Sequence, residues 1–323
     1  MFNVKKIRLV AGVSILALAL VACGGENAAK NEETANAPTN TATENTAKNE
    51  EKTDTAGDAA ELGDIAVISR EDGSGTRGAF TEITGLLEKD ASGNEVDNTS
   101  EDADIQNSTN GVMTTVAGNE SAIGYISLGS LNDTVKALKV EGVEPTAETI
   151  NSKEYKIARP FLLVTKGEPA EGTIEADFLK FAASKAGQDI VEAEGYVKVA
   201  GEEEYTPANI EGTITVAGST SVTPVMEKLV EEYTKLNPGA KLEIQSNGSS
   251  AGITAATDGT AQIGMSSREL KEEEKAAGIN EFVLAQDGIA VIVNTANPTE
   301  EITMDQVKTV FNGELATWAD LAK

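Results

Sequence analysis

Residues 214–236 read ITVAGSTSVTPVMEKLVEEYTKL, and this stretch decides the class of fold that we expect. Its first part, 214–217, is apolar and β-branched, which predicts a buried strand. Apolar residues then recur with helical spacing over 222–236, and Pro224 lies near the start, where its missing N–H removes no helical hydrogen bond. The stretch therefore predicts a strand and a helix joined by a short loop of glycine, serine and threonine.

The same alternation of strands and helices extends over the rest of the chain. Residues 65–68 and 289–293 are apolar runs that predict buried strands, and residues 241–245 alternate as in a strand with one exposed face. Thr303 and Gln306 have the spacing of a capping box, which predicts the start of another helix. Together these patterns predict an α/β fold with largely parallel sheets.

Two further segments share the strand–loop–helix design: residues 68–77, ISREDGSGTR, and residues 245–252, QSNGSSAG. At such a loop the helix N-terminus offers unpaired N–H groups and a partial positive charge, and glycine lets the backbone approach a ligand closely. Arg70 adds a permanent cation whose fork fits a tetrahedral oxyanion. Helix N-capping is the simpler explanation for any one loop. Three such loops predict a binding site for a small anion.

Composition excludes several classes of protein. The 323 residues include no histidine and one cysteine, which rules out a Ser–His–Asp triad, imidazole or cysteine-rich metal sites and an intramolecular disulfide. A net charge of −27 argues against binding to nucleic acid or directly to an anionic membrane surface. The sequence has no Gly-Lys-Ser/Thr phosphate loop, and its acidic residues fall mostly in solvated runs such as 202–204. We therefore expect a protein that is not an enzyme and needs no cofactor or metal.

The N-terminus carries the pattern of an export signal. Residues 1–22 combine three basic residues with an apolar run too short to span a bilayer comfortably, which is typical of a signal peptide. Small residues precede Cys23 and resemble a bacterial lipobox, so we expect two acyl chains on Cys23 and anchoring at the extracytoplasmic face of the cell membrane. An ordinary signal peptide with an incidental cysteine is the alternative. Residues 23–61 lack large apolar side chains and predict a disordered acidic tether.

The glycine loops and several neighbouring segments carry a resemblance to a known family. Over residues 62–323 the chain resembles the phosphate-specific substrate-binding lipoproteins of bacterial ABC importers, which have the two-lobed periplasmic-binding-protein fold of type II. The matching segments are VISREDGSGTRGAF (67–80), RPFLLVTKGE (159–168), ITVAGSTSVTPV (214–225), QSNGSSAGI (245–253), IGMSSREL (263–270) and DGIAVIV (287–293).

The resemblance implies a monomeric receptor that binds inorganic phosphate in a cleft between two lobes and delivers it to the permease subunits of an ABC importer. Two alternatives stay open. One is a receptor for another tetrahedral oxyanion, such as sulfate, molybdate or tungstate. The other is a surface sensor or structural lipoprotein that transports nothing.

The family's ligand contacts can be carried over residue by residue. They fall on Arg70, Ser74, Gly75, Thr76, Ser219, Thr220 and Ser249. Asp72 matches an aspartate that orients the arginine in the family. Ser267 stands where some members have an aspartate that accepts the proton of hydrogen phosphate. This difference leaves the rejection of sulfate open and makes Asp72 the best remaining proton acceptor.

The order of the segments differs from the usual family arrangement. That arrangement begins with the GSTSV segment, whereas this chain begins with VISREDGSGT and ends with ATWADLAK. The resemblance then implies a circular permutation, with one continuous lobe over 158–296 and a second lobe formed by 62–157 and 297–323. The hinge would lie near residues 155–160 and 294–298. A recombined gene product that fails to close is the alternative.

Overall fold

The computed structural model describes residue 59 and residues 61–322. The signal peptide, Cys23 and the tether up to residue 58 lie outside the described residues, so their predictions are not addressed by the structure. Within the described part of the chain, no helix combines the length and apolar character that crossing a membrane requires.

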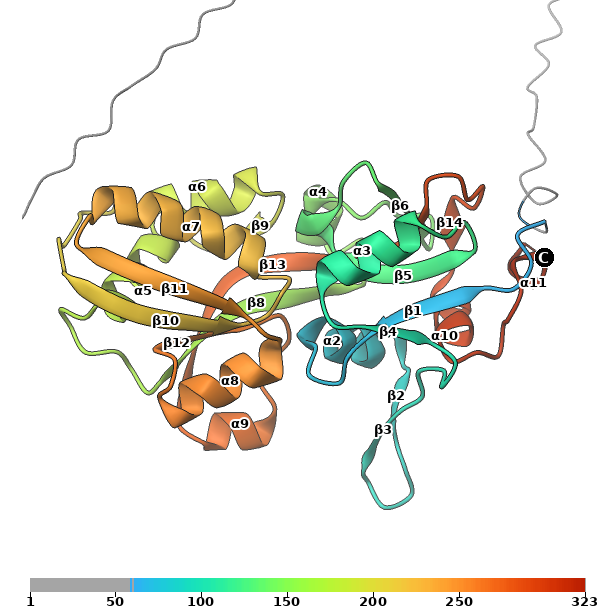
Figure 1. Cartoon of the computed structure of the whole chain (residues 1–323), viewed down its shortest axis with the longest axis horizontal. Helices are drawn as coiled ribbons and strands as arrows, with labels where there is room; N and C mark the ends of the chain where they lie inside the picture. Colours follow the sequence, from blue (N-terminus) through green and yellow to red (C-terminus); the bar gives the residue numbers. More distant parts are fainter. Residues whose placement is uncertain (1–58, 60, 323) are drawn as a thin grey trace, which may run out of the picture. The chain divides into compact units, whose positions relative to one another are not determined.

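One mixed sheet of ten strands forms the centre of the fold (Figure 1). Its strands are β1 (Ala66–Arg70), β4 (Asp104–Gln106), β5 (Ala122–Ser127), β6 (Val135–Ala137), β8 (Ala158–Lys166), β9 (Val197–Lys198), β10 (Gly212–Gly218), β11 (Ala240–Ser246), β12 (Ile263–Ser266) and β13 (Ile279–Asn294). Eight of them follow the order β11-β10-β12-β8-β13-β5-β1-β4, and β6 and β9 also pair with β13.

Strand direction divides this sheet into two parallel groups with an antiparallel centre. Strand β10 runs parallel to β11 and β12, and β1 runs parallel to β4 and β5. Strands β8 and β13 pair antiparallel with each other and with their neighbours. The predicted parallel arrangement is therefore found in the two outer groups, and the centre departs from it because β8 and β13 connect the groups.

Helices cover both faces of the sheet. The longer ones are α2 (Gly75–Thr84), α3 (Thr109–Ala117), α5 (Ile174–Ala183), α6 (Lys185–Ala193), α7 (Thr223–Leu236), α8 (Ser249–Asp258) and α10 (Met304–Phe311). Short elements are η1 (Leu128–Ser130), α4 (Ala147–Asn151), α9 (Glu272–Ala276) and α11 (Trp318–Leu321), with the strand pairs β2 (Leu87–Lys89) with β3 (Glu95–Asp97) and β7 (Lys139–Val140) with β14 (Glu301–Ile302). The capping box predicted at Thr303 and Gln306 is confirmed at the start of α10.

Two large hydrophobic cores are buried in the fold. The first, called the α7 core here, includes Phe161, Phe178, Phe181, Val216, Leu229, Tyr233, Ile263 and Ala285. The second, called the α10 core here, includes Phe80, Tyr125, Ile157, Ile289, Val310, Phe311 and Trp318. The rings of Phe80 and Tyr125 stack with their centroids 3.9 Å apart, and Phe311 meets both edge-on. Each core therefore belongs to its own group of parallel strands.

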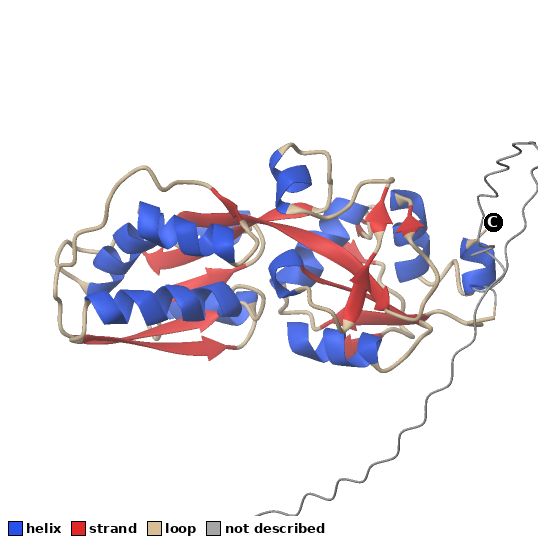
Figure 2. Ribbon diagram, turned by 90° about the horizontal axis from the view of Figure 1, so that it is seen from above, coloured by secondary structure: helices blue, strands red, loops and turns tan. Residues whose placement is uncertain are grey.

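Two strands pass from one core to the other, as Figure 2 shows from above for the long central strand. Just before and within β8, Ile157 belongs to the α10 core and Phe161 to the α7 core. Along β13, Ala285 belongs to the α7 core and Ile289 to the α10 core. The first change of core coincides with the hinge predicted at 155–160. The second change lies between Ala285 and Ile289, within β13, and so comes earlier in the chain than the hinge predicted at 294–298. Where the hinge lies stays a prediction.

Candidate functional site

Three serine hydroxyls meet at the carboxyl ends of β10 and β12 and at the first turn of α8. The Ser219 hydroxyl donates to Ser267 Oγ at 2.9 Å, and Ser249 Oγ lies 3.3 Å from Ser267 Oγ. The Ser267 amide donates to Ser249 Oγ at 3.1 Å, and all three side chains are buried. Because β10 and β12 are parallel neighbours, their ends lie at the same edge of the sheet. We call these three residues the hydroxyl cluster.

Gly75, the first residue of α2, lies directly against the hydroxyl cluster. A Cβ atom added to Gly75 would lie 2.7 Å from Ser267 Oγ and would also collide with Ser249. Only a residue without a side chain allows this approach, so the spacing in the GSGT sequence brings the N-terminus of α2 onto the serines. The structure thus brings together parts of all three loops that the sequence predicts to bind an anion: Gly75, Ser219 and Ser249 each come from a different one.

A second row of hydroxyls links α2 and α3 to the loop before α7. Thr76 Oγ1 lies 2.8 Å from Ser221 Oγ. Thr109 Oγ1 lies 3.2 Å from Ser221 Oγ and 3.2 Å from Thr220 Oγ1. The contact between Thr76 and Ser221 joins α2, which packs on the α10 core, to the loop before α7, which packs on the α7 core.

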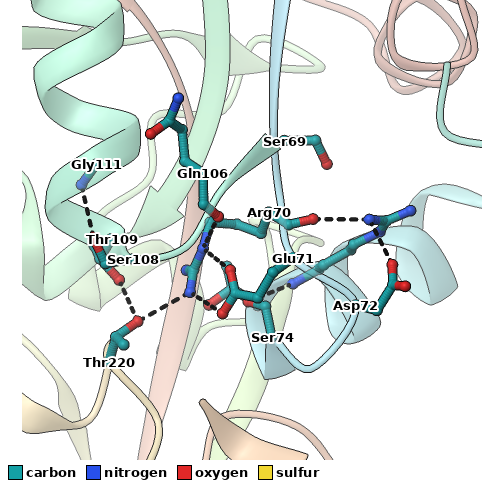
Figure 3. Close-up of polar contacts among 12 residues, drawn as sticks. Ser69, Arg70, Glu71, Asp72, Ser74, Gln106, Ser108, Thr109, Gly111 and Thr220 are labelled. Atoms are coloured by element: carbon teal, nitrogen blue, oxygen red, sulfur yellow. Dashed lines mark hydrogen bonds and ion pairs between the residues drawn. The ribbon is translucent and has the colours of Figure 1, made fainter. Parts of the chain in front are cut away.

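Arg70, at the end of β1, brings a positive charge to this site (Figure 3). Its Nε and Nη2 atoms each donate to one oxygen of Glu71 at 2.9 Å. Nη2 also donates to Thr220 Oγ1 at 3.1 Å, and Nε donates to the Gln106 carbonyl at 3.2 Å. The Arg70 side chain is buried, so a low-dielectric environment strengthens each of these contacts.

Asp72 does not occupy the position predicted for it. Its side chain is 97% exposed and pairs with Arg77, at 3.0 Å. Asp72 lies in the turn between β1 and α2 and faces outward there, whereas the neighbouring Glu71 turns toward Arg70. Glu71 therefore orients Arg70, and the prediction that Asp72 does so is corrected. An exposed carboxylate paired with Arg77 is also poorly placed to accept a proton from a buried anion.

Ser74 caps a helix, which is the simpler of the two explanations, capping or anion binding, for a serine in such a loop. It is the N-cap of α2, and its hydroxyl accepts from the Arg77 amide at 3.3 Å. Ser219 and Ser249 are not N-caps, and the N-cap of α8 is Gly248, at φ 97° with no side-chain capping bond. Which of the predicted residues contacts an anion stays a prediction.

The four helices α2, α3, α7 and α8 begin near these hydroxyl and arginine groups. A helix N-terminus carries unpaired N–H donors and a partial positive charge, and hydroxyls can donate as well. The arrangement can therefore hold a small oxyanion away from water. Among residues 61–322, no group of three or more carboxylate, cysteine or histidine side chains is arranged to hold a metal ion.

Known proteins are similar to this chain in sequence and in fold. Residues 36–186 and 203–323 match the family described as PBP superfamily domain. A Streptococcus agalactiae serotype V protein named phosphate-binding protein PstS 2 is 48% identical over 262 residues, which are 81% of this chain and 89% of that protein. Phosphate-binding protein PstS 2 of Streptococcus pneumoniae serotype 4 is 43% identical over 315 residues, 97% of this chain and 98% of that protein. The chain belongs to the PstS family.

A solved structure of the family extends the likeness to three dimensions. The crystal structure of a phosphate-binding protein of a phosphate ABC transporter from Streptococcus pneumoniae TIGR4 is 48% identical, with a TM-score of 0.64. The match covers 80% of this chain and all of that one. The two-lobed periplasmic-binding-protein fold expected from the sequence is thereby confirmed.

Segment order within the PstS family bears on the predicted permutation. The pneumococcal relative matches this chain almost from end to end, so it has its segments in the same order. A shared order is difficult to reconcile with an isolated recombination accident in this chain. That the order is permuted relative to other PstS proteins, and that the lobes divide at 157/158 and 296/297, stay predictions.

Sequence reasoning missed three residues of this PstS site. The sequence does not distinguish Glu71 from Asp72 as the partner of Arg70, because both carboxylates follow the arginine directly. Ser221 follows Ser219 and Thr220 in the same loop, and the pattern of residues does not single it out. Thr109 follows Ser108, which caps α3 by accepting from the Gly111 amide at 3.0 Å. A serine and a threonine before a helix are the same signal as in the other loops, and they could have identified this fourth helix start.

Proposed function

We propose that this PstS-family chain is an extracytoplasmic, lipid-anchored receptor that binds inorganic phosphate and delivers it to an ABC importer. The observation that carries the proposal is a buried arginine beside a cluster of buried hydroxyls where several helices begin. The names of the relatives, phosphate-binding protein PstS 2, support it from an independent direction.

Phosphate chemistry fits these groups. A tetrahedral oxyanion leaves water only where donors replace its hydration, and the site offers hydroxyls, backbone amides at helix starts and Arg70. Serine and threonine hydroxyls can rotate from one another toward an anion, so their present partners do not prevent donation. The net charge of the whole chain is no obstacle, because charges beyond about 8–10 Å are largely screened at physiological salt.

Binding is tested by titrating the purified protein with phosphate, sulfate, molybdate and tungstate in a calorimeter. We expect saturable binding of phosphate with one site per chain. Molybdate or tungstate binding far more tightly than phosphate would assign the site to that anion. No heat of binding for any of the four anions would contradict the proposal.

Sulfate is the second candidate ligand, and one observation favours it. Ser267 presents a neutral hydroxyl in the cluster, Glu71 is engaged by Arg70, and Asp72 is exposed. A site without a free carboxylate acceptor lacks a group that would repel sulfate. We propose that Ser267→Asp restores discrimination and weakens sulfate binding on the order of a hundredfold relative to phosphate. Equal weakening of both anions would show that the position does not set selectivity.

The anchor, the permease partner and a monomeric state belong to the same proposal. Lipid attachment at Cys23 is tested by labelling cells with a palmitate analogue, with Cys23→Ser as the control that should lose the label. Transport is tested by phosphate uptake in cells that lack the protein. Unchanged uptake in such cells would favour a sensor over a transport receptor. We propose no catalytic activity for the chain.

A further inference from the structure

A buried ion pair lies next to the hydroxyl cluster and outside it. Arg159, on β8, and Asp287, on β13, face each other in the register of the two strands. Arg159 Nε and Nη2 donate to Asp287 Oδ2 at 3.1 and 3.0 Å, and the two side chains are 1% and 0% exposed. The Ser127 hydroxyl, at the end of β5, donates to the other carboxylate oxygen at 2.9 Å.

The third donor of the guanidinium reaches the anion site. Arg159 Nη1 donates to the backbone carbonyl of Ser267 at 3.0 Å. Ser267 in turn is bonded to Ser219 and Ser249 through its hydroxyl and its amide. A continuous chain of contacts therefore runs from Asp287 through Arg159 into the hydroxyl cluster.

The ion pair lies where both connecting strands change from one core to the other. Arg159 comes between Ile157 of the α10 core and Phe161 of the α7 core. Asp287 comes between Ala285 and Ile289, which also belong to different cores. A buried ion pair carries a large desolvation cost and rarely adds net stability, so its presence at this crossing calls for another role.

We propose that Arg159, held by Asp287, is a positioning residue for the anion site: it fixes the backbone of Ser267 and so links phosphate affinity to the two strands that join the lobes. This proposal rests on the proposed function. Loss of the Asp287 charge would leave the guanidinium without its counter-charge and loosen its bond to Ser267. The hydroxyl cluster would then be less well ordered for an anion.

The surroundings of Asp287 make this role sensitive to pH. Its neighbours are Arg159 on β8, Ser127 on β5, the Gly129 amide and the phenols of Tyr155 and Tyr196. Arg70 adds a positive field at Arg159. Burial raises the pKa of Asp287 to about 6, although Arg159 and Ser127 oppose the shift. The carboxylate is therefore charged above that pH and takes up a proton as the pH falls through it.

The test is calorimetric titration of the full chain and of Asp287→Asn with phosphate from pH 5 to pH 8. At pH 8 we expect the variant to bind about tenfold more weakly, as for other residues that support ligand-contacting groups. At pH 5 we expect the two affinities to converge, because the side chain at position 287 is then neutral in both proteins. The ionisation of phosphate itself cancels in the ratio of the two affinities. A ratio that does not change with pH would overturn the proposal.

Two further variants make the result specific. Arg159→Lys keeps the positive charge but removes the guanidinium group that contacts both Asp287 and Ser267, so it should weaken phosphate binding at pH 8. This variant also tests the proposal if Asp287→Asn does not fold. Glu192→Gln removes an exposed ion pair with Lys198 and should change affinity at no pH. Native affinity in Arg159→Lys would also overturn the proposal. Absence of phosphate binding by the unsubstituted chain would instead overturn the proposed function, and this inference with it.

Discussion

At the residue scale, Arg70 shows both what could be predicted from the sequence and what could not. The strand, glycine loop and helix around it indicated an anion site, and the structure places its Nη2 against Thr220 from another loop. Its carboxylate partner could not be predicted, because Glu71 and Asp72 follow it in sequence and differ in which side of a turn they face. Turn geometry at single residues depends on tertiary contacts such as these.

Arg70→Ala should weaken phosphate binding about a hundredfold or more, because it removes a buried cation and leaves Glu71 as an unpaired carboxylate near the anion. Calorimetry measures the loss. Arg70→Lys, which keeps the charge but not the fork, should fall between this variant and the unsubstituted protein. Near-native affinity in Arg70→Ala would place the site elsewhere.

Gly75→Ala should weaken phosphate binding while leaving the two cores intact. The added methyl group would collide with Ser249 and Ser267, so the start of α2 could not approach the hydroxyl cluster. Gly73→Ala is a matched control, since its Cβ would meet the nearest atom, Ser250 Cβ, at an ordinary 4.0 Å. Equal affinities for the two variants would argue against close contact at Gly75.

At the scale of elements, local patterns predicted some strands and helices well. The stretch from 214 to 236 forms β10 and α7 as expected, and the capping box at Thr303 is present. Strand β13 was predicted only over 289–293, although it begins at Ile279. Its first part mixes polar and apolar residues, and it is extended because it pairs with β8 over Ile279–Gly288. Long-range pairing of that kind leaves no periodic signal in one sequence.

Thr303→Ala should destabilise the protein by about 1 kcal/mol, because it removes the hydroxyl that accepts from the Gln306 amide at the start of α10. Thr309→Ala, in the last turn of the same helix, should cost less because alanine has a higher helix propensity than threonine and no N-cap is lost. Urea denaturation measures the two free energies of unfolding. An equal loss in both variants would show that the cap is not what stabilises α10.

At the scale of the whole molecule, the described ends of the folded part lie side by side. The Ile65 amide donates to the Ala316 carbonyl at 2.8 Å, and the Trp318 amide donates to the Gly63 carbonyl at 3.0 Å. The segment between β9 and β10 is held by Tyr205, whose hydroxyl donates to Asp177 at 2.6 Å. Adjacent ends and an exposed connection are the conditions under which chains tolerate circular permutation.

A rearranged chain should therefore fold and bind phosphate as the natural one does. In the rearranged chain, a short glycine-rich linker would join residue 323 to residue 62. The new ends would lie between Glu202 and Glu203, which are exposed. Circular dichroism and calorimetry compare the two proteins. A rearranged chain that folds but does not bind would show that the natural order contributes to the site.

A crystal structure of the protein grown with phosphate tests directly whether the anion binds beside Arg70 and the hydroxyl cluster. We expect one ordered phosphate within hydrogen-bond distance of Arg70 and of hydroxyls from Thr76, Ser219 and Ser249. A phosphate bound tightly elsewhere in the molecule, with Arg70 still held only by Glu71, Gln106 and Thr220, would contradict it.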